Sequence, residues 1–438
     1  MFVVGLAVLT FAWFGAGRST DRSSGRARMG NGPRRGEVPG LVTHDLIIIG
    51  GGAGGLGAAR AGRWAKADVV MVNDGPIGGD CTFTGCVPSK TLLAAGRDGL
   101  GFGAAMTRVH ETIDRIAATE TADVLRGEGI DVVEGRARLV DAETVAVGDR
   151  RLTGRRIVIA TGSRAAVPPI PGLDSVPTLT NETVFDLSEA PRLLGIVGGG
   201  PIGCEMAQAF RRLGVPVVVF EAEDRLLTRE EPEAGAAVAS ALTAVGVDVR
   251  TGQRIDSVES APGGGIVVVT AAGRVEVEQL LVAVGRVPNA AVLGLGELGV
   301  ETDRRGHVVT DDRLATTVNG IYAAGDVTGK LAFTHAADEM GRLAAGNALR
   351  KGPRGRFRTK WIPWTTFTDP EVARVGMTAA EAAEHGGRVA HLPLEEMDRA
   401  LTDGRTDGYI KPIAGPRRVL RRAGGGQLVG ATIVAPRA

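Results

Sequence analysis

The sequence predicts an α/β fold with two similar halves, because one pattern of buried strand, glycine-rich turn and helix occurs twice. In the first copy, residues 45–49 form a short apolar run of the kind that builds parallel sheets. The turn after it fits G-x-G-x-x-G and leads into a helix of small residues over 56–65. Its first glycine allows the tight bend, the second lets a pyrophosphate approach and the third lets the helix pack on the strand. These glycines are Gly50, Gly52 and Gly55.

The second copy begins at the apolar run 194–197 and continues into a helix over 204–213. The glycines of its turn are Gly198, Gly200 and Gly203. The next strand, 215–220, ends at Glu221, whose carboxylate can accept hydrogen bonds from both hydroxyls of a ribose and would repel a 2′-phosphate. The sequence therefore favours NADH over NADPH in this half. Two such turns in one chain predict two dinucleotides, such as FAD and NAD(H).

The first half differs at the corresponding position, where the strand 68–72 is followed by Asn73 and Asp74. An asparagine can still accept a hydrogen bond from a ribose hydroxyl, although more weakly than a carboxylate.

Two further segments suit a flavin. Residues 157–163 form a strand and turn that would close the first dinucleotide domain, and 320–326 place an aspartate after a strand of small residues.

Two of the three cysteines, Cys81 and Cys86, lie five positions apart just after the first glycine-rich turn. A helix beginning near Cys86 would place both sulfurs at its N-terminal turn, where the helix dipole stabilises a thiolate. Such a pair can cycle between disulfide and dithiol. The alternative is two buried cysteines that never react. We favour the redox pair because the neighbouring motifs require a flavin, and we expect a reducing, cytoplasmic location because three cysteines do not build a disulfide-stapled secreted protein.

Composition adds limits on location and partners. The formal net charge is +1 and no block of like charge follows residue 40, which gives no support for nucleic-acid binding. Residues 2–17 are apolar, but a spanning helix needs about 20 such residues. We expect residues 1–42 to be a leader that does not belong to the native protein, with Met29 as a candidate start. A membrane anchor through 2–17 is the alternative.

Three more segments complete a family resemblance: Val284–Asn289, Thr334–Ala337 and Trp364–Gly376. With them, the chain resembles the pyridine nucleotide–disulfide oxidoreductases, the class I flavoprotein disulfide reductases that include dihydrolipoamide dehydrogenase and mercuric reductase. The resemblance covers 43–438, and its most specific motif is the Cys-Val-Pro-Ser-Lys that begins at Cys86. It implies two Rossmann-like domains, for FAD and NAD, and an incomplete α+β dimerisation domain that forms a homodimer. The implied domains are 43–180 and 296–352 for FAD, 181–295 for NAD and 353–438 for the interface.

The resemblance also assigns roles. Cys86 is implied as the charge-transfer thiol beside the flavin, and Cys81 as the interchange thiol that meets the substrate. Lys90 is implied to pair with Glu205 near the flavin. Asp80 stands where a small threonine is usual, and a carboxylate so close would tend to raise a thiol pKa. Besides Lys90 and the residues named for the two nucleotide sites, the implied cofactor contacts are Thr161, Gly162, Gly285, Gly325, Asp326 and Ala337.

The family's histidine–glutamate dyad, which acts on the partner's cysteines from a C-terminal segment, is missing from this sequence. None of the six histidines lies in the expected segment, and the chain stops within 430–438. His391 precedes Glu396 at a similar spacing, but it falls too early in the chain. We therefore expect a C-terminally truncated chain with a weakened dimer, in which protonation of a leaving substrate thiolate is impaired.

We expect an FAD-dependent, NAD(H)-linked disulfide oxidoreductase, closest to dihydrolipoamide dehydrogenase, that acts on a small-molecule disulfide or thiol. Two enzymatic alternatives stay open: a mercuric reductase-like activity, and an NADH diaphorase or quinone reductase whose cysteines stay idle. A non-catalytic or membrane-tethered redox flavoprotein is the alternative from another class. We assign no metal ligand and no nucleic-acid partner, and no motif names the physiological electron acceptor.

Overall fold

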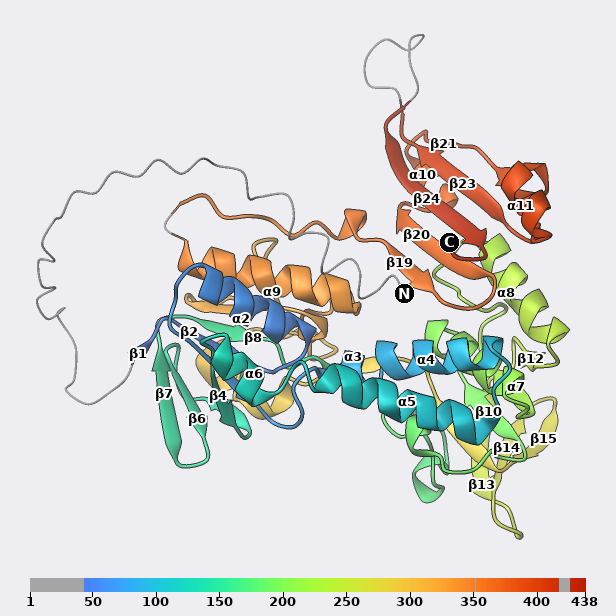
Figure 1. Ribbon diagram of the computed structural model, residues 1–438, viewed down its shortest axis with the longest axis horizontal. Coiled ribbons are helices and arrows are strands. Elements are labelled where there is room, and N and C mark those ends of the chain that lie inside the picture. Colours follow the sequence, from blue (N-terminus) through green and yellow to red (C-terminus); the bar gives the residue numbers. More distant parts are fainter. Residues whose placement is uncertain (1–42, 351, 417–425) are drawn as a thin grey trace, which may run out of the picture. The chain divides into compact units, whose positions relative to one another are not determined.

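The structure, a computed structural model, describes residues 43–350, 352–416 and 426–438 (Figure 1). The predictions of a leader over 1–42 and of a membrane anchor over 2–17 lie outside these residues. None of the helices in the described part is long and apolar enough to cross a membrane.

The first parallel sheet has five strands in the order β18-β8-β2-β3-β4. Every neighbouring pair is parallel, and the strand before the first glycine turn is buried along its whole length. Helices α2 and α9 pack so closely that a Cβ on Gly341 would lie 1.9 Å from the Gly54 carbonyl oxygen. A segment from late in the chain therefore completes the first half. The elements are β2 Leu46–Ile49, α2 Ala53–Trp64, β3 Val69–Asn73, β4 Asp131–Glu134, β8 Ile157–Ile159, β18 Ile321–Ala323 and α9 Thr334–Leu349.

The second parallel sheet has four strands in the order β12-β11-β10-β16, again with every neighbouring pair parallel. A three-stranded antiparallel sheet, β13-β14-β15, belongs to the same stretch of chain. The elements are β10 Leu194–Val197, α7 Pro201–Arg212, β11 Val217–Phe220, α8 Pro232–Ala244, β12 Asp248–Arg250, β13 Ile255–Ser260, β14 Ile266–Thr270, β15 Gly273–Val277 and β16 Gln279–Val282.

The helices after the two glycine turns begin three residues earlier than the sequence predicts, at Ala53 and at Pro201. Gly52 and Gly200 are their N-caps, so the end of each turn is already helical. Strand β3 ends at Asn73 itself, one residue later than predicted. Each of these shifts is three residues or fewer.

A bundle of helices joins the two halves. Helix α4, which follows the cysteine segment, packs on α5 and on α7, the helix of the second glycine turn. One hydrophobic cluster runs through all three, and Phe102 of α5 lies beside Phe210 of α7 with ring centroids 6.0 Å apart. The elements are α3 Gly79–Phe83, α4 Cys86–Arg97, α5 Phe102–Ala117 and α6 Ala122–Gly127.

The C-terminal part is a six-stranded sheet whose main path is β19-β20-β24-β23-β21, with β22 beside β23. All its pairs are antiparallel. Buried ion pairs hold it to the second half: Arg374 Nε lies 3.0 Å from Glu230 Oε2, and Lys411 Nζ lies 3.3 Å from Glu231 Oε2. The elements are β19 Trp364–Thr366, β20 Glu371–Gly376, α10 Ala379–Glu384, β21 Arg388–Val389, β22 Leu392–Pro393, α11 Asp398–Asp403, β23 Tyr409–Ala414 and β24 Leu428–Ala435.

Two small sheets complete the described part. One has the order β1-β7-β6-β5, and the other pairs β9 with β17. The β9–β17 pair places a segment of the first half beside the chain that leaves the second half, and so brings Ser163 close to Arg286. The elements are β1 Thr43–His44, β5 Ala137–Leu139, β6 Thr144–Val147, β7 Arg150–Gly154, β9 Ser163–Ala165 and β17 Arg286–Pro288.

Candidate redox-active site

The two glycine-rich turns have nearly the same geometry. Gly50 and Gly198 both have φ of 109°, a backbone region that favours glycine. A Cβ on Gly55 would lie 1.8 Å from the Gly50 carbonyl oxygen, and one on Gly203 would lie 1.9 Å from that of Gly198. The structure therefore requires glycine at the first and third positions of each turn.

Both turns leave a helix N-terminus open. Neither N-cap, Gly52 or Gly200, makes a side-chain capping hydrogen bond, and neither helix has an acidic residue in its first turn. A Cβ on Gly200 would meet nothing within 4 Å. Free backbone N–H groups and the positive end of a helix dipole form an anion-binding site, so both turns fit a pyrophosphate.

Asn73, the last residue of β3, and Glu221, the residue directly after β11, make equivalent contacts. Gly51 N donates to Asn73 Oδ1 at 2.7 Å, and Gly199 N donates to Glu221 Oε2 at 2.6 Å. Each side chain thus tightens its own turn from the neighbouring strand. Asp74 is exposed and forms an ion pair with Arg136 at 2.9 Å, so it is held on a neighbouring segment of the first half.

The cysteines lie on two helices and not on one, which corrects the prediction that both sulfurs share one N-terminal turn. Cys81 belongs to the short helix α3, and Cys86 is the first residue of α4. Gly85 separates the helices with φ of −124° and ψ of −111°. A Cβ there would lie 2.8 Å from the Asp80 carbonyl oxygen, so the break needs a glycine.

The two thiols nevertheless interact and are chemically unlike. The Cys81 side chain donates a hydrogen bond to Cys86, and together with the charge of Lys90 this lowers the pKa of Cys86 to about 6. The same hydrogen bond, followed by burial, raises the pKa of Cys81. Thr334 Oγ1, at the start of α9, lies 3.2 Å from Cys86 Sγ. At neutral pH the dithiol therefore holds a thiolate on Cys86 and a proton on Cys81.

The predicted contact between Lys90 and Glu205 forms. Lys90 Nζ donates to Glu205 Oε2 at 2.7 Å, and Phe367 N donates to the other oxygen, Oε1, at 2.9 Å. The Lys90 ammonium also lies over the Phe367 ring, 4.6 Å from its centroid. Glu205 is only 4% exposed, so its charge is compensated by direct partners and not by water.

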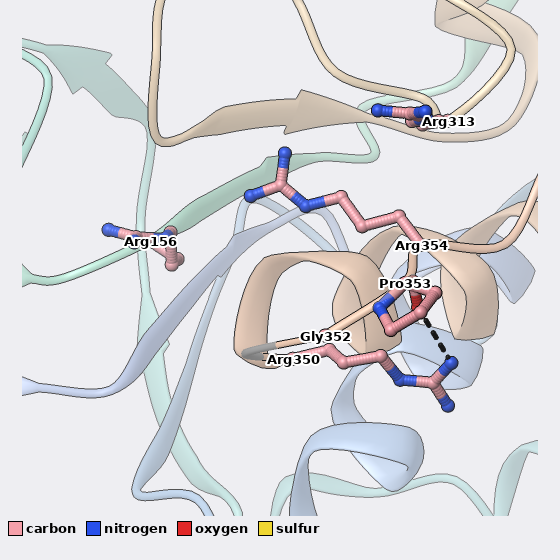
Figure 2. A pocket seen from close by; sticks show the side chains of 6 residues that line it. All are labelled: Arg156, Arg313, Arg350, Gly352, Pro353 and Arg354. Atoms are coloured by element: carbon pink, nitrogen blue, oxygen red, sulfur yellow. Dashed lines mark hydrogen bonds between the residues drawn. The ribbon is translucent and has the colours of Figure 1, made fainter.

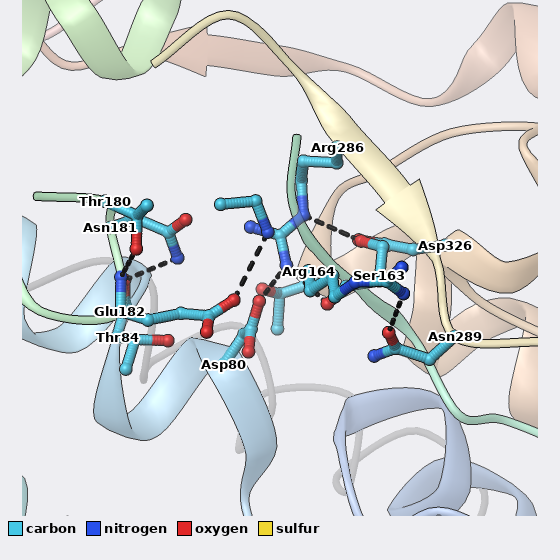
Figure 3. A network of polar contacts seen from close by, with 12 residues as sticks. Asp80, Thr84, Ser163, Arg164, Thr180, Asn181, Glu182, Arg286, Asn289 and Asp326 are labelled. Carbon is cyan, nitrogen blue, oxygen red and sulfur yellow. Dashed lines mark hydrogen bonds and ion pairs between the residues drawn. The ribbon is translucent and has the colours of Figure 1, made fainter. Parts of the chain in front are cut away.

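A network of polar contacts surrounds Asp326 (Figure 3). Asp326 Oδ2 accepts from Ser163 Oγ at 2.7 Å and lies 3.5 Å from Arg286 Nε. Arg286 Nη2 also donates to Asp80 Oδ2. This network joins the aspartate predicted to bind flavin to the residue directly before Cys81.

The other predicted cofactor contacts lie on nearby turns and the start of α9. Thr161 Oγ1 donates to Asn289 O at 2.6 Å. Gly162, Gly285 and Gly325 all have positive φ values. A Cβ on Gly325 would lie 3.3 Å from that of Ala337, in the first turn of α9.

Comparison with known proteins gives the family. The family model described as pyridine nucleotide-disulphide oxidoreductase matches residues 44–341, and the model of that family's dimerisation domain matches 362–438. The chain belongs to this family. It is therefore a flavoprotein oxidoreductase that acts on a sulfur group and uses FAD and NAD(P)H. The dimerisation domain supports a homodimer.

Several named relatives are similar to this chain over most of its length. The mercuric reductase of Staphylococcus aureus is 34% identical over 90% of this chain and 75% of its own length. The probable pyridine nucleotide-disulfide oxidoreductase RclA of Escherichia coli is 32% identical over 84% of this chain and 86% of its own. Among solved structures, the Cu(II) complex of the HOCl-induced flavoprotein disulfide reductase RclA is similar, with a TM-score of 0.81 and 30% identity over 90% of both chains. The structure of LpdA of Mycobacterium tuberculosis is also similar, with a TM-score of 0.79 and 29% identity over 90% of both chains.

These findings confirm the predicted family, the α/β fold with dinucleotide-binding domains, and the cofactor pair. The roles of individual residues and the domain boundaries stay predictions. Sequence reasoning missed three side chains that the structure brings to the site: Ser163, Arg286 and Thr334. Each lies in a segment that the sequence analysis had named, 157–163, 284–289 or 334–337, but no local pattern gave its side chain a role, because that role depends on contact with a distant segment.

A separate basic hollow of about 600 Å³ lies near the C-terminal end of α9 (Figure 2). None of the predicted site residues lines it. Arg156 Nε donates to Ala348 O at 3.3 Å, so the Arg156 guanidinium caps a backbone carbonyl at the C-terminal end of α9. The lining residues are Arg156, Arg313, Arg350, Gly352, Pro353 and Arg354.

Proposed function

We propose that this flavoprotein is an NADH-dependent reductase in which Cys81 and Cys86 cycle between a disulfide and a dithiol. In each cycle the Cys86 thiolate and the Cys81 thiol give two electrons to a thiophilic acceptor, form a disulfide and release one proton. A disulfide acceptor becomes a thiol, which takes this proton, and a thiolate. A thiolate-binding metal ion is reduced by the two electrons, and the proton goes to water. When bound, FAD supplies the two-electron relay between the nicotinamide and the sulfur pair. The observation that carries the proposal is the unequal thiol pair, with the pKa of Cys86 lowered to about 6 and that of Cys81 raised.

This asymmetry gives the two sulfurs separate tasks. Cys86 holds the thiolate, because Cys81 donates to it and the Lys90 ammonium is near. Cys81 keeps its proton until the pair is used, and it is the sulfur we assign to the acceptor. Glu205 holds Lys90 in place through the 2.7 Å contact and is itself held by the backbone N–H of Phe367.

The second glycine turn supports NADH as the electron donor. Glu221 Oε2 accepts from Gly199 N, and its Oε1 accepts from Glu223 N at 2.8 Å. These bonds fix a carboxylate beside the turn, where it can accept from ribose hydroxyls. A 2′-phosphate would meet this negative charge, which disfavours NADPH.

For the acceptor, the relatives support a soft metal ion at least as well as a disulfide. A mercuric reductase is 34% identical to this chain, and the RclA structure is a Cu(II) complex. Thiolates are the ligands that soft metal ions prefer, whereas Cu(II) favours nitrogen and oxygen ligands, so the similarity to the mercuric reductase carries this argument. We therefore propose Hg(II) as the first acceptor to test, with lipoamide and other small disulfides as the second.

The deciding experiment is an anaerobic NADH titration of the FAD-loaded protein, followed by denaturation and thiol counting. We expect NADH to create two new thiols per chain and a long-wavelength band from a thiolate next to the flavin. The Cys81→Ser variant should create neither, and it should not oxidise NADH with Hg(II) or a disulfide. A wild-type protein that gains no thiols but still reduces quinones would establish the diaphorase alternative and reject the proposal.

A further inference from the structure

The residue directly before Cys81 is a carboxylate that forms an ion pair with an arginine. Asp80 lies in helix α3 with Cys81, and Arg286 Nη2 donates to its Oδ2. The two residues are 206 positions apart in the chain. Arg286 begins strand β17, in the segment that leaves the second half of the molecule. A contact between such distant segments, beside the cysteine pair, calls for an explanation beyond local folding.

We infer that Arg286 is a positioning residue that neutralises the Asp80 carboxylate and so keeps the Cys81–Cys86 pair reactive at neutral pH. This inference rests on the proposed function, because it concerns how the same cysteine pair is kept ready to react. It assigns Arg286 no contact with substrate. Its effect is electrostatic and acts through Asp80.

The position of the guanidinium is fixed independently of Asp80. Arg286 Nε donates to Ser163 Oγ at 2.7 Å, and Nη2 donates to Ser163 O at 2.8 Å. On the other side, Nε lies 3.5 Å from Asp326 Oδ2. The Arg286 side chain is 20% exposed, whereas that of Asp80 is 44% exposed. The more buried and better anchored arginine therefore determines where the Asp80 carboxylate lies (Figure 3).

The other charges near the cysteine pair show why neutralising Asp80 is important. The charge of Lys90 lowers the pKa of Cys86. Glu205, which forms an ion pair with Lys90, raises the pKa of Cys86 and so opposes this effect. Glu120 raises the pKa of Cys81, and its Oε2 accepts from Thr82 Oγ1 at 3.3 Å. The surroundings thus already hold one carboxylate that opposes ionisation of a thiol of the pair. An Asp80 carboxylate without Arg286 would add a second and would oppose thiolate formation.

The test is the pH dependence of thiol alkylation in the FAD-loaded, chemically reduced protein. Iodoacetamide rates are measured from pH 4.5 to 9, and mass spectrometry assigns the label to Cys81 or Cys86. We expect Arg286→Gln to raise the midpoint by about 0.5–1 pH unit, which makes the reaction about two- to fivefold slower at pH 6. Asp80→Asn should lower it or leave it in place, and Arg286→Lys, which keeps the charge, should stay near wild type.

The double variant Asp80→Asn/Arg286→Gln separates electrostatics from structure. If Arg286 acts by neutralising Asp80, removing both charges should return the midpoint to within about 0.3 units of wild type, although the anchoring contacts are lost. A double variant shifted as far as Arg286→Gln alone, or an Arg286→Gln variant with no shift, would overturn the inference. If Arg286→Gln does not fold, a midpoint in Asp80→Asn that is higher than in wild type would overturn it as well.

Arg164→Gln is the matched control. Arg164 lies in the same network region, but its Nη1 donates to Asn289 Oδ1 at 3.0 Å and not to a carboxylate beside the cysteines. Its alkylation midpoint should equal that of wild type. Alkylation needs neither NADH nor an acceptor, so a failed electrostatic inference remains distinguishable from a failed reductase proposal, which the thiol count after NADH decides.

Discussion

The two glycine-rich turns are built alike but end in different side chains. Each has a first glycine with φ of 109° and a third glycine that no larger residue can replace without a collision. Each is tightened by a side chain on the neighbouring strand that accepts from the backbone N–H between the first two glycines. In the first half this side chain is the neutral Asn73, and in the second it is the charged Glu221.

This difference separates a structural role from a recognition role. Both side chains accept the same backbone hydrogen bond, at 2.7 Å and 2.6 Å, so closing the turn does not require charge. Asn73 Nδ2 also donates a hydrogen bond to Gly75 O at 2.7 Å. Glu221 keeps a full negative charge, which is what distinguishes a ribose hydroxyl from a phosphate. We infer that selectivity is concentrated in the second half, where the mobile electron donor must be chosen.

The largest expected effects come from the third glycine of each turn. Gly55→Ala places a methyl group 1.8 Å from the Gly50 carbonyl oxygen, and Gly203→Ala does the same at 1.9 Å from Gly198. Because the obstacle is backbone, we expect each to destabilise its half by about 3 kcal/mol. Gly55→Ala should lose FAD, whereas Gly203→Ala should keep FAD and lose NADH binding, as measured by flavin absorbance and NADH titration.

Gly103→Ala is the control for both variants. A Cβ there meets nothing within 4 Å, and the residue lies in helix α5, where alanine is the better helix former. Its thermal midpoint should stay the same or rise. Equal loss of FAD in Gly55→Ala and Gly203→Ala would show that the two halves do not bind their nucleotides independently.

The next largest effect is expected at the contact that links the halves. Lys90 lies on α4, and Glu205 lies on α7 in the second half. Lys90→Met leaves a carboxylate that is 4% exposed without its cation, so we expect a loss of about 3 kcal/mol in unfolding free energy. The pKa of Cys86 should also rise from about 6, because a cation that favours the thiolate is gone. Thiolate at pH 7 should therefore decrease, measured by alkylation against pH.

Glu205→Gln tests the same contact from the other side. The glutamine side chain keeps an oxygen for the Phe367 N–H, and Lys90, with its side chain 30% exposed, can be solvated. Its stability should fall less than that of Lys90→Met. Since Glu205 raises the pKa of Cys86, its removal should move the alkylation midpoint to lower pH, opposite to Lys90→Met. Shifts of the same sign in both variants would contradict an electrostatic origin.

These contacts show what the sequence can predict. The glycine turns were predictable because each is specified by residues within a few positions of one another. The break at Gly85 was not, because two short helices and one longer helix have similar local patterns. The contacts of Thr334 with Cys86 and of Arg286 with Asp80 span 248 and 206 positions, and no periodicity carries such information. Lys90 and Glu205 were paired only through the family resemblance.

A smaller effect is expected at the charge that distinguishes the second turn. Glu221→Gln keeps an oxygen for the Gly199 N–H, so the fold should remain intact. The loss of charge should weaken NADH binding about tenfold and bring NADPH closer to it, because a repulsion has been removed. The ratio of kcat/KM for NADH and NADPH measures this change. An unchanged ratio would place nucleotide selectivity elsewhere in the second half.

The smallest effect is expected where the first turn is given the charge of the second. Asn73→Asp should keep the hydrogen bond from Gly51 N but lose the one to Gly75 O. Asn73 is 9% exposed, so the new carboxylate must be compensated by that N–H and by the ribose hydroxyls of the bound nucleotide. FAD should therefore bind a few-fold more tightly, while the protein without FAD becomes less stable. Flavin release in mild denaturant, compared with wild type, measures the first effect, and thermal unfolding of the FAD-free protein measures the second. Weaker FAD binding in Asn73→Asp would mean that the neutral amide is itself the preferred partner of the first nucleotide.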